Sequence, residues 1–181
     1  MRLAVFALVL GSALFAAAQP ARVIVIRHAE KPDDPENSHL SEDGQVRAQR
    51  LVKWLTQGAV LGTNGPPAGL YAPQPTRRGF GVRCSETLQP SARRLGQQLK
   101  IAHGSADYEF LAHLILRDKS LRGKNVVVCW THEFLPQLAA ACGVDPPPPK
   151  WKGDDYDSAY IITFPEGKAA LERSKERLKK N

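Results

Sequence analysis

Two histidines in this chain of 181 residues directly follow short runs of apolar residues. Arg27 and His28 come after residues 23–26, and His132 comes after residues 125–130. An unprotonated imidazole can attack an electrophile or accept a proton, and a guanidinium can hold an anion through two parallel hydrogen bonds. His28 beside Arg27 therefore suggests a nucleophile or base next to an anion clamp, although a strand that merely ends in polar residues would look the same.

Both apolar runs have the composition of buried strands that could position such side chains. They are short, continuous and rich in β-branched residues, as expected for strands covered on both faces of a parallel sheet. In open α/β sheets, ligands bind just past the carboxyl ends of the strands. Each run ends in a histidine followed closely by a carboxylate, Glu30 or Glu133, and a third polar segment, residues 83–87, opens a predicted helix between them. This repetition favours a functional site over a chance polar end.

The order of these motifs resembles the histidine phosphatase superfamily, the group that includes the phosphoglycerate mutases and the histidine acid phosphatases. The Arg-His-Gly of the family corresponds to residues 27–29, its Arg-x-x-x-Thr to residues 83–87, and its second histidine, at the tip of a later strand, to His132. The resemblance extends over residues 22–164, nearly all of the chain after residue 18. It implies an α/β fold with the active site at the carboxyl edge of the sheet.

The chain departs from the family pattern at three places. Ala29 replaces the usual glycine, and Leu88 stands where many relatives have alanine. Residues 73–82, which include Arg77 and Arg78, resemble an insertion relative to the family pattern. Either of these arginines could therefore assist the second arginine of the pattern.

The resemblance implies the hydrolysis of a phosphate monoester through a phosphohistidine on His28, without a metal or other cofactor. A phosphate monoester is a dianion, so its oxygens must be neutralised during attack on phosphorus. Arg27 and Arg83 can bind these oxygens bidentately, and His132 adds a donor if it is protonated. An exported enzyme would have little access to the cytoplasmic intermediates that mutases isomerise, and this favours a phosphatase.

The leaving oxygen needs a proton, and Glu133 is the first candidate to donate it. Glu109 is the alternative acid, since some relatives supply theirs from the middle of the chain. Lys31, in the polar segment after the first strand, is expected to contact the substrate. The predicted catalytic residues are Arg27, His28, Arg83, His132 and Glu133, and the predicted substrate-binding residues are Arg27, Lys31, Arg83 and His132.

The predicted substrate is a small phosphorylated molecule or a phosphorylated component of the cell envelope. Two other classes of function stay open. The same pocket could belong to an envelope protein that binds phosphate or a phosphorylated ligand without turnover, and a basic terminal helix could serve an envelope interaction protein. The net charge of +7 is spread along the chain, and no basic block interleaved with aromatic residues predicts nucleic-acid binding.

The beginning of the chain has the composition of an export signal. Arg2 precedes the apolar residues 3–15, and the small residues 16–18 suit cleavage. We therefore predict a signal peptide over residues 1–18 and a single histidine phosphatase-like catalytic domain over residues 19–181. The mature protein would be periplasmic or secreted, with no stable membrane anchor.

Strands and helices alternate along the chain, which implies a three-layer α/β sandwich with a mostly parallel central sheet and helices on both faces. Ser41 is expected to cap a helix whose Val46, Leu51, Val52 and Leu55 face the sheet. The other predicted elements are strands at 70–72 and 157–164 and helices at 87–100, 110–121, 134–141 and 166–180, with Pro90 in a first turn. No segment is long enough to form a cap domain, so an open site is expected.

The three cysteines, Cys84, Cys129 and Cys142, do not have the spacing of a zinc site. Cys129 and Cys142 flank a short strand-to-helix unit, and a disulfide between them would be possible in an oxidising compartment. Buried structural thiols are the alternative. Cys84 adjoins Arg83, so a catalytic thiol is also considered there.

Overall fold

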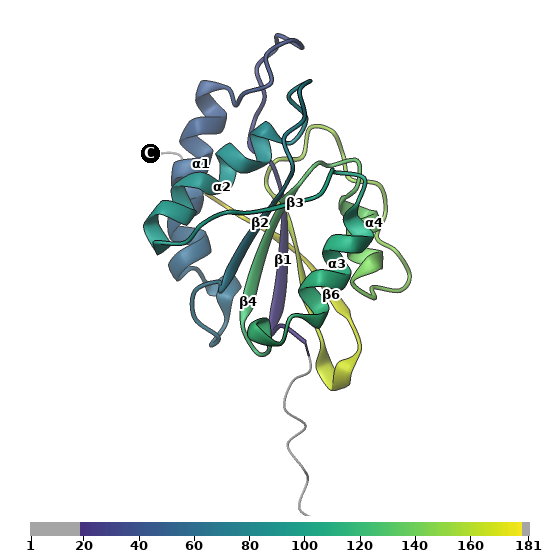
Figure 1. Cartoon of the computed structure of the whole chain (residues 1–181). Helices are drawn as coiled ribbons and strands as arrows, with labels where there is room; N and C mark the ends of the chain where they lie inside the picture. Colours follow the sequence, from purple (N-terminus) through teal and green to yellow (C-terminus); the bar gives the residue numbers. More distant parts are fainter. Residues whose placement is uncertain (1–18, 179–181) are drawn as a thin grey trace, which may run out of the picture.

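The computed structural model describes residues 19–178, so the predicted export segment lies outside the described residues. Six strands form one sheet at the centre of the molecule (Figure 1). In order across the sheet they are β3 (Lys100–Ala102), β2 (Gly69–Pro73), β4 (Asn125–Trp130), β1 (Arg22–Arg27), β5 (Ser158–Thr163) and β6 (Ala170–Lys175). Within residues 19–178, no helix is both long and apolar enough to cross a bilayer.

The pairing of the strands brings the two histidine-bearing ends to one edge. β1 is parallel to β4, and β2 is parallel to both β4 and β3, whereas β5 is antiparallel to β1 and to β6. In this register Arg27 lies opposite Trp130. The residues that follow them, His28 and Thr131, therefore leave the sheet side by side at its carboxyl edge.

Four α-helices cover the two faces of the sheet. The helices α1 (Glu42–Gln57) and α2 (Val82–Leu95) lie on one face, and α3 (Tyr108–Arg117) and α4 (Leu135–Ala141) lie on the other (Figure 1). Successive β4 residues alternate between the faces, because Val127 and Cys129 pack under α1 and α2 while Val126, Val128 and Trp130 pack under α3 and α4. Each fully buried aliphatic side chain contributes about 1.5–3 kcal/mol to folding. The predicted three-layer sandwich is confirmed.

The helix α1 begins where the sequence predicts. The Ser41 hydroxyl accepts a hydrogen bond from the Gly44 amide at 3.1 Å and so caps the helix. A Cβ on Gly44 would lie 2.3 Å from the Glu30 carbonyl oxygen, so only glycine lets α1 pack against the segment after His28. The prediction that Val46 faces the sheet is wrong, since this side chain is 45% exposed. The residues of α1 that are buried are Gly44, Ala48, Leu51 and Leu55.

The helix α2 begins and ends five residues earlier than the predicted helix at 87–100. Gly81 precedes it with a φ of 88°, a left-handed conformation in which a larger residue would be strained. Pro90 consequently lies inside the helix, so its predicted place in the first turn is wrong. The earlier start puts Arg83 and Thr87 on the first two turns, at the carboxyl edge of the sheet.

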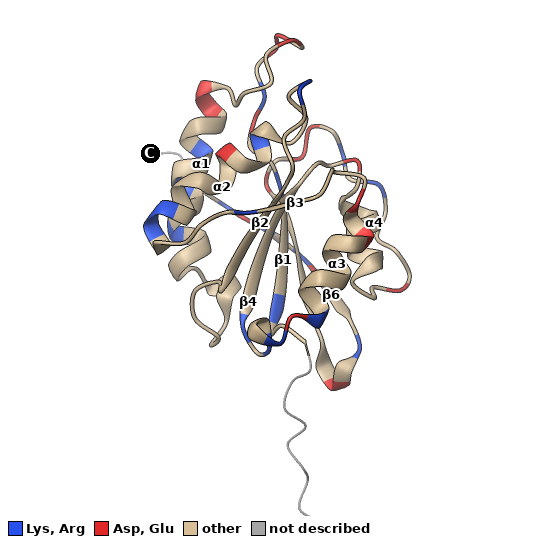
Figure 2. Ribbon diagram, in the orientation of Figure 1, with Lys and Arg blue, Asp and Glu red and all other residues tan. Residues whose placement is uncertain are grey.

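The predicted terminal helix at 166–180 is wrong over the described residues. A short 3₁₀ turn, Pro165–Gly167, leads into β6, which pairs with β5. The many charged residues of this segment are typical of a helix exposed to solvent, but they also suit an edge strand, which must resist pairing with other chains. The strands in the interior of the sheet, unlike β6, carry few charged residues (Figure 2).

The disulfide considered between Cys129 and Cys142 does not form, and the alternative of buried thiols is confirmed. Cys129 lies beside Cys84 on the face covered by α1 and α2, whereas Cys142 belongs to the core on the opposite face. All three thiols are free and buried. Burial raises the pKa of the Cys142 thiol to about 12, which disfavours its thiolate, and Cys84 is 0% exposed, which leaves its sulfur inaccessible as a nucleophile.

Candidate active site

The carboxyl ends of β1 and β4 open into a cavity of about 370 Å³. Every predicted site residue lines it: Arg27, His28, Lys31, Arg83, His132 and Glu133. Glu109, the alternative acid, does not. It lines a separate cavity of about 980 Å³ beside α3 and α4, and Glu133 is the one lining residue that the two cavities share.

His28 is held as a neutral imidazole with one free nitrogen. Its side chain is 7% exposed, and Nδ1 lies 2.7 Å from the carbonyl oxygen of Ala29. Because a carbonyl oxygen can only accept, Nδ1 carries the proton and Nε2 keeps its lone pair. Burial is the main cause that lowers the pKa of His28 to about 4; the hydrogen bond to Ala29 opposes it, and the positive charges of Arg27 and Arg83 add to it. At neutral pH, Nε2 is therefore available as a nucleophile.

Arg27 lies on the floor of the cavity and is 3% exposed. Its Nη1 donates to the carbonyl oxygen of Gly153 at 2.5 Å, and its guanidinium carbon lies 3.8 Å from the centroid of the Tyr156 ring. These two contacts fix the plane of the guanidinium. The buried Nε has no acceptor among the described residues, and four of the five guanidinium N–H donors remain beyond the bond to Gly153.

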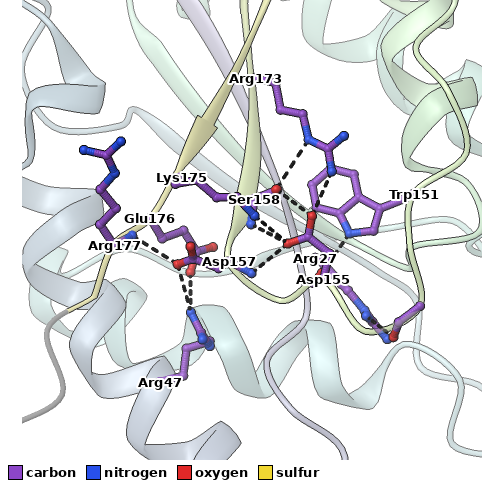
Figure 3. A network of polar contacts seen from close by, with 11 residues as sticks. Arg27, Arg47, Trp151, Asp155, Asp157, Ser158, Arg173, Lys175, Glu176 and Arg177 are labelled. Carbon is purple, nitrogen blue, oxygen red and sulfur yellow. Dashed lines mark hydrogen bonds and ion pairs between the residues drawn. The ribbon is translucent and has the colours of Figure 1, made fainter.

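The segment that holds Arg27 is itself fastened to the edge of the sheet by Asp155 (Figure 3). This carboxylate accepts hydrogen bonds from the Ser158 hydroxyl at 2.7 Å, from Arg173 at 2.8 Å and from Lys175 at 3.2 Å. Burial alone would raise the pKa of Asp155, but the hydrogen bonds from Ser158 and Lys175 outweigh it and hold this pKa well below its usual range. Residues 151–157 are thereby tied to β5 and β6.

Sequence reasoning did not find Gly153, Asp155 or Tyr156. The contact between Arg27 and Gly153 spans 126 positions of the chain. No periodicity or motif near residue 153 indicates that its backbone will meet the first strand.

Arg83 lines the cavity from α2 and is half-buried. Its Nε donates to the carbonyl oxygen of His39 at 3.0 Å, and its Nη2 donates to the carbonyl oxygen of Asn37. A guanidinium has five N–H donors, so three remain beyond these two bonds. Thr87 links α2 to the end of β1, because its hydroxyl accepts from the Ala29 amide at 2.9 Å and donates to the Arg83 carbonyl at 2.7 Å.

His132 and Glu133 follow β4 on the opposite wall. Burial lowers the pKa of His132, the charge of Arg27 lowers it further, and Glu133 opposes both effects. His132 is thus neutral at pH 7 until an anion binds beside it and favours its protonated form. Glu133 is exposed and lies ahead of α4, whose N-cap is Phe134, so its carboxylate is free to face the cavity that it lines.

The loop between β2 and α2 adds residues that the family pattern does not contain. Arg78 and Phe80 line the cavity, whereas Arg77 is not among its lining residues. The loop projects beside the segment 32–40, with basic residues at its tip (Figures 1 and 2). Of the two arginines in this insertion, Arg78 is thus the one at the site.

Among residues 19–178, no group of three or more His, Cys, Asp or Glu side chains is gathered so that it could hold a metal ion.

No family model matches the sequence, and no curated protein matches it. The fold, however, is shared with solved phosphatase structures. A mycobacterial glucosyl-3-phosphoglycerate phosphatase in complex with inorganic phosphate has a TM-score of 0.57 and 15% identity, over 88% of this chain and 100% of that chain. The protein histidine phosphatase SixA, complexed with tungstate, has a TM-score of 0.51 and 13% identity, over 86% and 97%.

A phosphoserine phosphatase from Entamoeba histolytica, in complex with 3-phosphoglyceric acid, has a TM-score of 0.53 and 12% identity, over 83% of this chain and 94% of that chain. At these identities the likeness establishes the fold alone, which is the phosphoglycerate mutase-like fold. The resemblance predicted from the motifs is confirmed at that level.

Proposed function

We propose that this protein is a phosphatase that hydrolyses a phosphate monoester through a phosphohistidine on Nε2 of His28. The observation that carries the proposal is the Nδ1 contact of His28 with a carbonyl oxygen at 2.7 Å, which leaves Nε2 unprotonated in a cavity that Arg27 and Arg83 also line. The solved structures with the same fold include several proteins described as phosphatases, and this agrees with the proposal.

In the first step, the phosphate dianion binds to the unused donors of Arg27 and Arg83. His28 Nε2 attacks phosphorus, a P–N bond forms, and the bond between phosphorus and the alcohol oxygen breaks. The alcohol oxygen takes the bonding electrons and a proton. Glu133 is the proposed proton donor because it lines the same cavity, whereas Glu109 lies in the other one.

In the second step, water attacks the phosphohistidine and Glu133 takes the proton that the water loses. The P–N bond breaks and its electrons return to His28. The net reaction consumes one ester and one water and releases one alcohol and inorganic phosphate. Arg27 and Arg83 neutralise the phosphoryl oxygens in both steps, and protonation of His132 adds a further donor.

The test is to incubate the purified protein with phenyl phosphate that is labelled in its phosphate group. The reaction is then quenched under alkaline conditions, in which phosphohistidine survives. The wild type should release phenol and retain label, and His28→Asn should do neither. An envelope protein that merely binds phosphorylated ligands would bind phenyl phosphate without releasing phenol. If the folded wild type gives that result, the phosphatase proposal is rejected in favour of a binding protein.

We further propose that the enzyme acts outside the cytoplasm, on a small phosphorylated molecule or a phosphorylated envelope component. The support is the composition of residues 1–18, with Arg2 ahead of an apolar run and small residues. Cell fractionation should find the full chain outside the cytoplasm and a chain lacking residues 2–18 inside it. Equal distribution of the two would reject export through this segment.

A further inference from the structure

The cavity holds more positive charge than the phosphate of a monoester needs. Among the described residues, four side chains that are always or normally cationic line it: Arg27, Lys31, Arg78 and Arg83. Arg27 is buried and Arg83 is half-buried, so these two form the deep end beside His28. Two arginines match the two negative charges of a phosphate monoester.

Lys31 and Arg78 are both exposed and lie at the mouth of the same cavity. Neither forms an ion pair with a carboxylate among residues 19–178. The carboxylates that line the cavity are Glu36 and Glu133, and Glu133 is assigned to proton transfer. At the mouth, Lys31 and Arg78 carry two positive charges against the one negative charge of Glu36, so positive charge remains there after the phosphate has been neutralised at the deep end.

Arg78 is presented by a tight and well-bonded turn. The Thr76 amide donates to the Phe80 carbonyl at 2.9 Å, and the Gly79 amide donates to the Thr76 carbonyl at 2.9 Å. Gly79 has a φ of 79°, and a Cβ there would lie 2.1 Å from the Cβ of Ser38. Only glycine permits this approach, which places the turn directly against the opposite rim of the cavity. The position of Arg78 is thus set by the backbone of both rims.

Phe80, on the same turn, lines the cavity while 59% of it is exposed. Its ring is an apolar part of the cavity wall. At about 370 Å³, the cavity is near the small end of ligand sites, which span about 300–1,000 Å³. It suits a small molecule with an apolar or planar middle section.

We infer that the substrate carries a second anionic group, which Lys31 and Arg78 bind at the mouth while its phosphate lies beside His28. The second group is a carboxylate or a further phosphate, separated from the reacting phosphate by a short section that contacts Phe80. This inference rests on the proposed function, since it names the substrate class of the same cavity. A neutral alcohol phosphate would leave the charge at the mouth unused.

The experiment compares 4-carboxyphenyl phosphate with 4-carbamoylphenyl phosphate, which differ only in a carboxylate against a neutral amide of similar shape. Their kcat/KM values are measured with wild type, Lys31→Gln and Arg78→Gln. Arg77→Gln is the matched control, because it removes the same charge from the adjacent, exposed position that does not line the cavity. Affinities are measured in parallel by calorimetry with His28→Asn, which cannot consume the ligand.

The wild type should prefer the carboxylate on the order of 10-fold, as expected for hydrogen bonds from charged donors near solvent. Arg78→Gln and Lys31→Gln should each shrink this ratio, whereas Arg77→Gln should keep it. Equal kcat/KM values and equal affinities for the two esters would overturn the inference while hydrolysis of both upholds the phosphatase. Binding that prefers the carboxylate without any turnover would keep the subsite and reject the phosphatase.

A ratio that Arg77→Gln lowers as much as Arg78→Gln would also overturn the inference, because it would assign the preference to the general charge of the loop. If neither ester binds while a phosphorylated peptide is hydrolysed, the mouth serves a macromolecule and the proposed small substrate is wrong.

Discussion

Replacing His28 by asparagine should make the protein less sensitive to acid, in addition to abolishing turnover. The pKa of His28 falls from its ordinary 6.5 to about 4 in the folded protein, chiefly because the ring is buried. The unfolded chain therefore binds a proton near pH 6.5, whereas the folded protein binds it only near pH 4. Between these values protons favour the unfolded chain, so stability that is present at pH 7 is lost as the pH falls from 6.5 to 4.

The size of this loss follows from the distance between the two pKa values. Each pH unit is worth about 1.4 kcal/mol, so His28 lowers the free energy of unfolding by roughly 3 kcal/mol across this window. Asparagine does not ionise, so the variant escapes this part of the acid destabilisation. All other groups titrate in both proteins, and their contributions cancel in the comparison.

The assay is urea unfolding of wild type and His28→Asn at a series of pH values between 7.5 and 4, in a buffer without phosphate. Phosphate must be absent because an anion beside His28 would stabilise its charged form. The matched control is His113→Asn, at an exposed histidine outside the catalytic cavity, whose curve should follow the wild type. Parallel curves for wild type and His28→Asn would refute the buried, neutral imidazole on which the mechanism depends.

Three further predictions test the remaining assignments. Glu133→Gln should slow the hydrolysis of alkyl phosphates by about 10²–10⁴-fold. Hydrolysis of nitrophenyl phosphate should slow far less, since a nitrophenolate needs no proton to leave. If Glu109→Gln shows this pattern instead, the acid is Glu109. Asp155→Asn should lower kcat/KM by about 10- to 100-fold, because it loosens the segment that orients Arg27. Asp154→Asn, at the exposed neighbouring position, should leave kcat/KM unchanged. Equal effects of the two substitutions would show that Asp155 does not position Arg27. Thr87→Val should cost about 1–3 kcal/mol in urea unfolding, because it leaves a buried amide and carbonyl without their partner, and a neutral result would show that the two motifs are not coupled.

The ends of β1 and β4 were predictable because burial on both faces makes a central strand apolar along its whole length. The polar residues that follow such a strand must then lie at the sheet edge, and Arg27, His28 and His132 do lie there. The motif at residues 83–87 belongs to the same edge because its helix packs on β2 and β4 and Thr87 bonds the Ala29 amide that follows β1. These features are predictable because the composition of each short stretch indicates whether that stretch is buried.

The errors occur where the local pattern fits two structures. The charged segment after residue 165 suits a surface helix and an edge strand equally, and pairing with β5 decided for the strand. Gly79 and Gly81 gave the insertion the composition of a loop, which hid the start of α2 at Val82. Cys129 and Cys142 are close in sequence, but the alternation of β4 sends Cys129 to the other face of the sheet.

The sequence by itself determined the fold class, the sheet edge and the residues that meet there, because apolar runs and short motifs carry that information locally. The tertiary structure alone decided which partners orient them. It placed Gly153 and Tyr156 on Arg27, chose Arg78 over Arg77 for the cavity, and separated Glu109 from His28. Such contacts join segments far apart in the chain and depend on how loops close over a packed sheet, which no local pattern of residues records.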